Sequence, residues 1–176
     1  MAVGRAIVTA RDSLVENWLQ WIADRQGRST PDEPELRRTL ALIVRLLTHM
    51  TGPLRREARE TWLAAAELFG RLAEQRGLSA GEVADELQHL RELLIVELGD
   101  LIMALPVRQQ LPAVLRVNRV CDLGVSAAVV GYTDALVAKM FSRDGAVPTT
   151  ESNLELASRL QTLEAEVARF DARMNR

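Results

Sequence analysis

The feature that most constrains this chain is a long apolar stretch near its middle, at residues 111–141. Between Val120 and Gly131 the only overtly polar residues are Asp122 and Ser126. A helix built from these residues would be apolar on nearly all sides, and such a helix belongs inside a larger assembly of helices. We therefore expect this segment to form the central helix of a bundle.

The segment that follows this helix places its apolar residues at alternating steps of three and four, which are the a and d positions of a coiled coil. The seam consists of Asn153, Leu156, Leu160, Leu163, Val167, Phe170 and Met174. An amide at an a position is typical of a parallel two-stranded coiled coil, because one buried amide sets the register. We expect residues 143–176 to form a hinge and a coiled-coil signalling helix that pairs in a homodimer. The alternative is a last helix that packs back onto its own bundle.

The remaining segments show the helical period of apolar residues, and none shows the sustained alternation of a strand. The sequence therefore predicts an all-α fold. Residues 1–142 would form a helical domain of about five helices, arranged either as a simple bundle or in a globin-like way. The expected helices cover about residues 6–25, 34–50, 54–76, 79–105 and 112–142, and a sixth covers 150–174. The best-marked start is Ser79 with Glu82, which has the spacing of a capping box. Pro112 suits the first turn of its helix.

Composition excludes several classes of protein. The chain has 22 basic and 24 acidic residues, a net charge of −2, and no long block of like charge, so we expect no nucleic-acid partner. The single cysteine, Cys121, makes no internal disulfide and fits a reducing cytoplasm. Charged residues come too early for a secretory signal, and the longest apolar run is shorter than the ~20 residues of a membrane helix. We expect a cytoplasmic protein with no membrane insertion.

His89 is the weak candidate for a cofactor ligand. It follows Glu86 at the E-x-x-H spacing of di-iron bundles, but those sites need a second such motif and two further glutamates. A haem ligand needs apolar surroundings, whereas Arg91 and Glu92 lie beside His89. The sequence has no phosphate-binding glycine loop and no G-x-S-x-G or H-E-x-x-H motif. We expect no catalytic residues, no metal site and no cofactor.

Asp122 is the most unusual polar residue, because it lies in the most apolar segment. Burial of a lone carboxylate costs on the order of several kcal/mol, so we expect Asp122 either to pair or to face a helix crossing that is open to water. Arg119 is the nearest basic residue along the helix. The pair is either structural or a contact that changes with the signalling state. Cys121 beside it is interpreted as a buried packing residue rather than a redox-sensing thiol.

Small residues make the central helix thin, so that a neighbouring helix either approaches closely or leaves a gap for an apolar ligand. The residues that would wall such a pocket are Trp18, Trp62, Phe69, Gly124 and Ala128, and the simpler interpretation places the aromatic ones in the core. A small basic patch begins the third helix, at Arg55, Arg56 and Arg59. We interpret it as a solvated surface.

Three stretches in order are similar to the RsbRD-type N-terminal domain, the helical sensory module of stressosome co-antagonists that also precedes bacterial sensor kinases and cyclases. They are residues 11–19 (RDSLVENWL), 87–94 (LQHLRELL) and 118–129 (NRVCDLGVSAAV), the last followed by Gly131-Tyr132. The resemblance covers roughly residues 6–141. It implies a regulatory input domain that most relatives join to an output domain, such as a STAS domain, a kinase or a cyclase. Because the printed sequence stops after the heptads, we expect a fragment or a short protein that works through partners.

Together these observations predict a non-catalytic, cytoplasmic sensory domain of bacterial signal transduction. It would be a dimer that relays a conformational change through its C-terminal coiled coil to an output domain or partner protein. The alternative is a helical module that binds an apolar ligand or haem. Neither the residues nor the resemblance identifies the stimulus.

Overall fold

The computed structural model describes residues 2–26, 33–143 and 153–174 of the chain. Over these residues the chain forms seven helices and no strand, which confirms the predicted all-α class. The helices are α1 (Ala2–Gln26), α2 (Glu33–Met50), α3 (Arg59–Gln75), α4 (Ala80–Glu97), α5 (Gly99–Met103), α6 (Val107–Arg143) and α7 (Asn153–Met174). The count exceeds the expected five plus one because the predicted fourth helix is interrupted before Gly99, a residue with low helix propensity.

The starts of α3 and α6 also differ from the prediction. α3 begins at Arg59 rather than near residue 54, because Thr51 to Ala58 form irregular turns around Pro53. α6 begins at Val107, so Pro112 lies inside it instead of in its first turn. A proline there removes one intrahelical hydrogen bond, but it lies close enough to the N-terminus for the helix to continue.

The capping box at the start of α4 is confirmed. The backbone N–H of Glu82 donates to Ser79 Oγ at 3.3 Å, and the N–H of Ser79 donates to the Glu82 carboxylate at 2.7 Å. The hydrogen bond from the Ser79 backbone lowers the pKa of the Glu82 carboxyl below its ordinary value, because it stabilises the charged form. This cap fixes the tight turn between α3 and α4.

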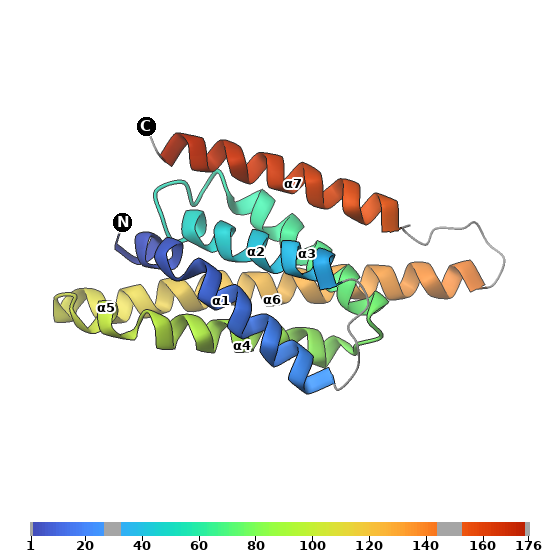
Figure 1. Cartoon of the computed structure of the whole chain (residues 1–176), viewed down its shortest axis with the longest axis horizontal. Coiled ribbons are helices and arrows are strands. Elements are labelled where there is room, and N and C mark those ends of the chain that lie inside the picture. Colours follow the sequence, from blue (N-terminus) through green and yellow to red (C-terminus); the bar gives the residue numbers. More distant parts are fainter. Residues whose placement is uncertain (1, 27–32, 144–152, 175–176) are drawn as a thin grey trace.

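α6 runs the length of the molecule and packs against α3, α4 and α5 (Figure 1). The backbones of α6 and α3 lie very close together. A Cβ added to Gly70 would lie 1.9 Å from the carbonyl oxygen of Ala128, and a Cβ added to Gly131 would lie 2.1 Å from the carbonyl oxygen of Glu67. The two helices therefore touch through their backbones. Of the two alternatives for the small residues of α6, the structure has the close approach.

The C-terminal helix α7 packs on α2 and α3 rather than extending away from the bundle (Figure 1). Four seam residues are buried there, with exposed fractions of 7% or less: Leu156, Leu160, Leu163 and Val167. Phe170 is partly buried and Met174 is exposed. The predicted extended stalk is therefore wrong for the chain in this structure, and the alternative of a helix packed back onto its bundle describes it.

The physical reason is that a 3-4 spacing specifies a narrow apolar stripe without specifying what covers it. The groove between α2 and α3 accepts that stripe as well as a partner helix would. The side chain of Asn153 and residues 144–152, which include most of the predicted hinge, lie outside the described residues. Pairing of this face with a second copy stays a prediction.

Among the described residues, one helix is long and apolar enough to cross a membrane by length and composition alone, at Val107–Phe141. The sequence analysis expected no such segment. The central helix of a bundle meets the same criteria, and α6 occupies that position. It also leaves part of one apolar face uncovered near its end, at Val130, Val137, Met140 and Phe141.

Candidate functional site

The residues predicted to wall an apolar pocket lie in the core and contact one another instead. The rings of Trp18 and Phe69 are 5.5 Å apart, and a Cβ added to Gly124 would lie 2.7 Å from the Trp62 ring. Trp18, Trp62, Phe69 and Ala128 have exposed fractions of 1% or less. These side chains fill the space between α1, α3 and α6, so the pocket interpretation is wrong for them and the core interpretation holds.

His89 and Glu86 do not converge on a common site. The His89 ring stacks on Trp21 with 4.2 Å between centroids, and its Nδ1 lies 3.3 Å from the Glu92 carboxylate. Glu86 is buried instead, where its carboxylate accepts hydrogen bonds of 2.5 and 3.1 Å from Arg76. The described residues contain no group of three or more His, Cys, Asp or Glu side chains suited to a metal ion.

The sequence analysis missed this buried Arg76–Glu86 ion pair. Trp18 Nε1 donates to the Glu86 carbonyl oxygen at 2.9 Å, which joins α1 to the same point. A signal was present, because the capping box at Ser79 predicts a tight turn that brings the end of α3 beside the start of α4. Removal of one partner from a buried pair of this kind costs about 3–5 kcal/mol, because it leaves the other charge buried and uncompensated.

Asp122 does not pair with Arg119. It is exposed and accepts a hydrogen bond of 3.1 Å from Arg91 on α4. Arg119 lies instead one turn earlier, beside α3. Cys121 is buried, and burial raises the pKa of its thiol to about 12, as expected for a packing residue rather than a reactive thiol.

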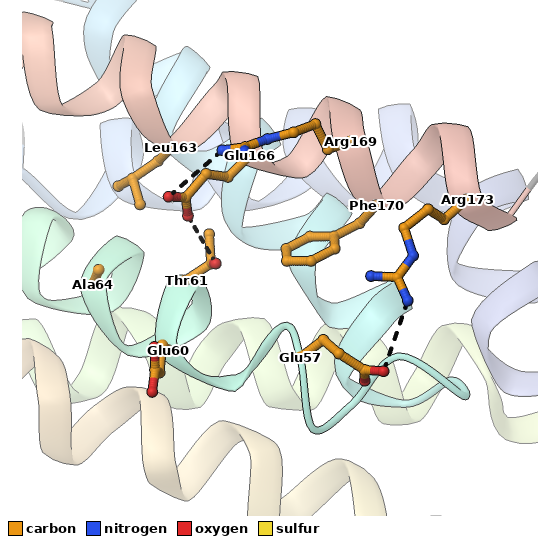
Figure 2. Close-up of a pocket in the computed structure, with 9 residues that line it drawn as sticks. All are labelled: Glu57, Glu60, Thr61, Ala64, Leu163, Glu166, Arg169, Phe170 and Arg173. Carbon is orange, nitrogen blue, oxygen red and sulfur yellow. Dashed lines mark hydrogen bonds and ion pairs between the residues drawn. The ribbon is translucent and has the colours of Figure 1, made fainter.

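Polar contacts hold α7 against the bundle at its two sides. On the α2 side, Arg38 donates two hydrogen bonds to Glu164, at 2.7 and 3.1 Å, and this contact raises the pKa of the Arg38 guanidinium. On the α3 side, Thr61 Oγ1 donates to Glu166 at 2.9 Å, and Arg173 lies 3.8 Å from Glu57 (Figure 2).

The most buried of these contacts is a three-residue cluster, Arg45, His49 and Asp171, which we call the Asp171 latch. The Asp171 carboxylate lies 2.5 Å from Arg45 Nη2 and 2.8 Å from His49 Nε2. Because a carboxylate only accepts, Nε2 carries the ring proton. The His49 side chain is 1% exposed, and its Nδ1 has no partner among the described residues.

A groove of about 530 Å³ runs between α3 and the second half of α7 (Figure 2). Phe170 and Leu163 reach into it from α7, and Ala64 faces them from α3. The second half of α7 is therefore held by polar contacts and by buried Val167, while a groove stays open on its α3 side.

A second hollow, of about 480 Å³, lies where the starts of α3 and α6 meet the end of α2. Five arginines surround it: Arg55, Arg56, Arg59, Arg116 and Arg119. We call it the arginine hollow. The basic patch predicted at α3 is thus joined by two further arginines from α6, which residue spacing alone did not predict.

Comparison of the chain with protein-family models, with curated proteins and with solved structures finds no match. The resemblance to RsbRD-type domains therefore stays a prediction based on the three short stretches named above.

Proposed function

We propose that this chain is a non-catalytic regulatory input domain of bacterial signal transduction, working in the cytoplasm, with α7 as its output helix. In the resting state α7 is docked on α2 and α3. A stimulus releases it, and the freed heptad face then pairs with a second copy or with a partner protein.

The observation that carries this proposal is that one face of α7 suits two kinds of partner. Leu156, Leu160, Leu163 and Val167 keep strict heptad spacing, although their present neighbours belong to a bundle of the same chain. A helix whose apolar face packs equally well on its own bundle and on a partner helix has two states. A stimulus that favours one state shifts the equilibrium between them.

The polar contacts of α7 favour such a switch. Most are partly exposed ion pairs, and pairs of this kind are worth roughly 0.2–1 kcal/mol each. The Asp171 latch is stronger, because its removal leaves the buried Nε2–H of His49 without an acceptor, at a cost of about 1–3 kcal/mol. The groove beside Phe170 further limits how firmly the second half of α7 is held.

The test compares Asp171→Ala with Gln161→Ala, a matched substitution on the exposed face of α7. Both are made in a chain with Cys121→Ala and Leu163→Cys, which places one thiol at a d position of the seam. We expect Asp171→Ala to raise the yield of disulfide-linked dimer about fivefold or more, since about 1 kcal/mol shifts the docking equilibrium by that factor. Gln161→Ala should leave the yield unchanged.

Hydrogen exchange of the α7 amides, measured on the same proteins, separates the two steps of the proposal. Loss of α7 protection without dimer would contradict pairing as the output. Full protection of α7 in the Asp171→Ala chain would contradict release itself.

A further inference from the structure

We infer that the arginine hollow is a binding site for a small amphipathic phosphate, meaning a molecule with a phosphate head and an apolar body. The inference stands apart from the release of α7, because the hollow is formed by α2, the turn that follows it, α3 and α6. The juxtaposition of Arg55, Arg56 and Arg59 with Arg116 and Arg119 carries it.

Charge is the first argument. The whole chain has a net charge of −2, yet five positive charges surround this one hollow. None of the five guanidinium groups has an ion-pair partner among the described residues, although ion pairs are common elsewhere on the surface. Five like charges in one place repel one another, so the arrangement destabilises the empty protein and favours an anion.

Two carboxylates close to the hollow are paired with arginines that do not line it. Glu57 and Glu60, which follow Arg56 and Arg59 along the chain, line the groove between α3 and α7, and Glu57 pairs with Arg173 (Figure 2). Asp122, one turn after residue 119, is held by Arg91. α3 also begins here, and its N-cap residue Ala58 supplies no side-chain hydrogen bond. The helix N-terminus adds partial positive charge.

The side chains that line the hollow between the arginines are apolar, and they favour a ligand with an apolar body. Met50 and Val120 are buried and form an apolar floor, and Leu115, Leu123 and Pro112 continue it along α6. A volume of about 480 Å³ lies within the usual range for sites that bind small molecules. A bare inorganic anion would leave this floor uncovered, whereas a ligand with an apolar body covers it.

Phosphate fits the charge count better than a carboxylate does. A phosphate monoester brings up to two negative charges and three oxygens, and guanidinium groups bind phosphate through paired N–H donors. One carboxylate would neutralise one of the five positive charges, whereas a phosphate dianion neutralises two. The ligand is either a soluble organic phosphate or the head of a phospholipid, which share this chemistry.

Octyl phosphate, kept below the concentration at which it forms micelles, is the probe that tests the site by isothermal titration calorimetry. Octyl glucoside and inorganic phosphate test the two halves of the probe separately. We expect octyl phosphate to bind more tightly than either and to bind more weakly as salt rises.

The variant Arg59→Gln with Arg119→Gln removes one arginine from each side of the hollow and should weaken octyl phosphate at least about tenfold. The matched control is Arg11→Gln with Arg25→Gln, which removes two exposed charges from α1, outside the hollow. It should stay within about twofold of the unaltered protein. Because Arg59 and Arg119 form no ion pair with any residue that the structure describes, the hollow variant should keep its helical circular dichroism and melt no lower than the unaltered protein.

Vesicles of phosphatidylcholine with and without phosphatidic acid distinguish the two sources of phosphate. Binding to the acidic vesicles that octyl phosphate displaces would support the site with a lipid head as its ligand. Binding of octyl phosphate without vesicle binding would support the site with a soluble ligand. The inference is overturned if octyl phosphate binds no more tightly than octyl glucoside, or if the two double variants weaken it equally.

Discussion

The close crossing of α3 and α6 makes a sharp prediction for Gly131→Ala. The added Cβ would lie 2.1 Å from the backbone oxygen of Glu67, and relief to 3.0 Å requires the two helices to separate by about 0.9 Å. Neither side of the contact is a flexible side chain that turns aside. Overpacking costs up to about 3 kcal/mol, and the higher helix propensity of alanine returns about 1 kcal/mol. We expect a net loss of about 2 kcal/mol in the free energy of unfolding.

Urea unfolding followed by circular dichroism measures this loss, and a shift of about 1 M in the midpoint is expected for a typical slope. Gly81→Ala is the control, since the nearest atom to its added Cβ is Ser79 Oγ at 3.9 Å. That variant should be about 0.5 kcal/mol more stable, because only the propensity and unfolded-chain effects remain. If Gly131→Ala were as stable as Gly81→Ala, the backbone contact between α3 and α6 would be refuted.

Three further outcomes are expected. Ser79→Ala should destabilise the protein by about 1 kcal/mol near neutral pH. The pKa of the Glu82 carboxyl is lowered in the folded state from about 4.5. The charged carboxylate therefore stabilises the fold fully above pH 4.5, and this stabilisation is lost as the pH falls through the lower pKa of the folded state. Thermal melts at pH values from about 3 to about 7 should show a smaller effect of Ser79→Ala in acid. Cys121, whose pKa burial raises to about 12, should react with a thiol reagent at pH 8 only after urea unfolding, and rapid labelling of the folded protein would contradict its burial. Leu160→Ala should cost about 2–5 kcal/mol by urea unfolding if α7 is docked as described, while Leu154→Ala, at an 82% exposed site, should change stability by less than about 0.5 kcal/mol.

Local sequence signals were sufficient where the structure depends on local physics. The capping box at Ser79 and Glu82 was predicted because its hydrogen bonds span only three residues. The burial of Cys121 followed from the apolar segment around it. The helix starts at Arg59 and Val107 were not predicted. The turns around Pro53 delay the first start, and α6 begins before Pro112, and both depend on packing against neighbouring helices.

Pairing across helices was predicted less well. Asp122 was expected to pair along its own helix with Arg119, yet its partner is Arg91 of α4, which only the packing of α4 on α6 brings near. The arginine hollow shows the same limit. Three close arginines at and just before the start of α3 were visible in the sequence, but Arg116 and Arg119 join them only because α3 and α6 run side by side.

The sequence by itself determined the all-α class, the α4 cap and which face of each helix is apolar, since these follow from the helical period and from short-range hydrogen bonds. Only the tertiary structure decided that α7 lies on α2 and α3, that the glycines of α6 bring it against α3, and that five arginines meet around one hollow. An apolar stripe is stabilised by any surface that excludes water from it, so its spacing predicts burial but does not select the surface that covers it.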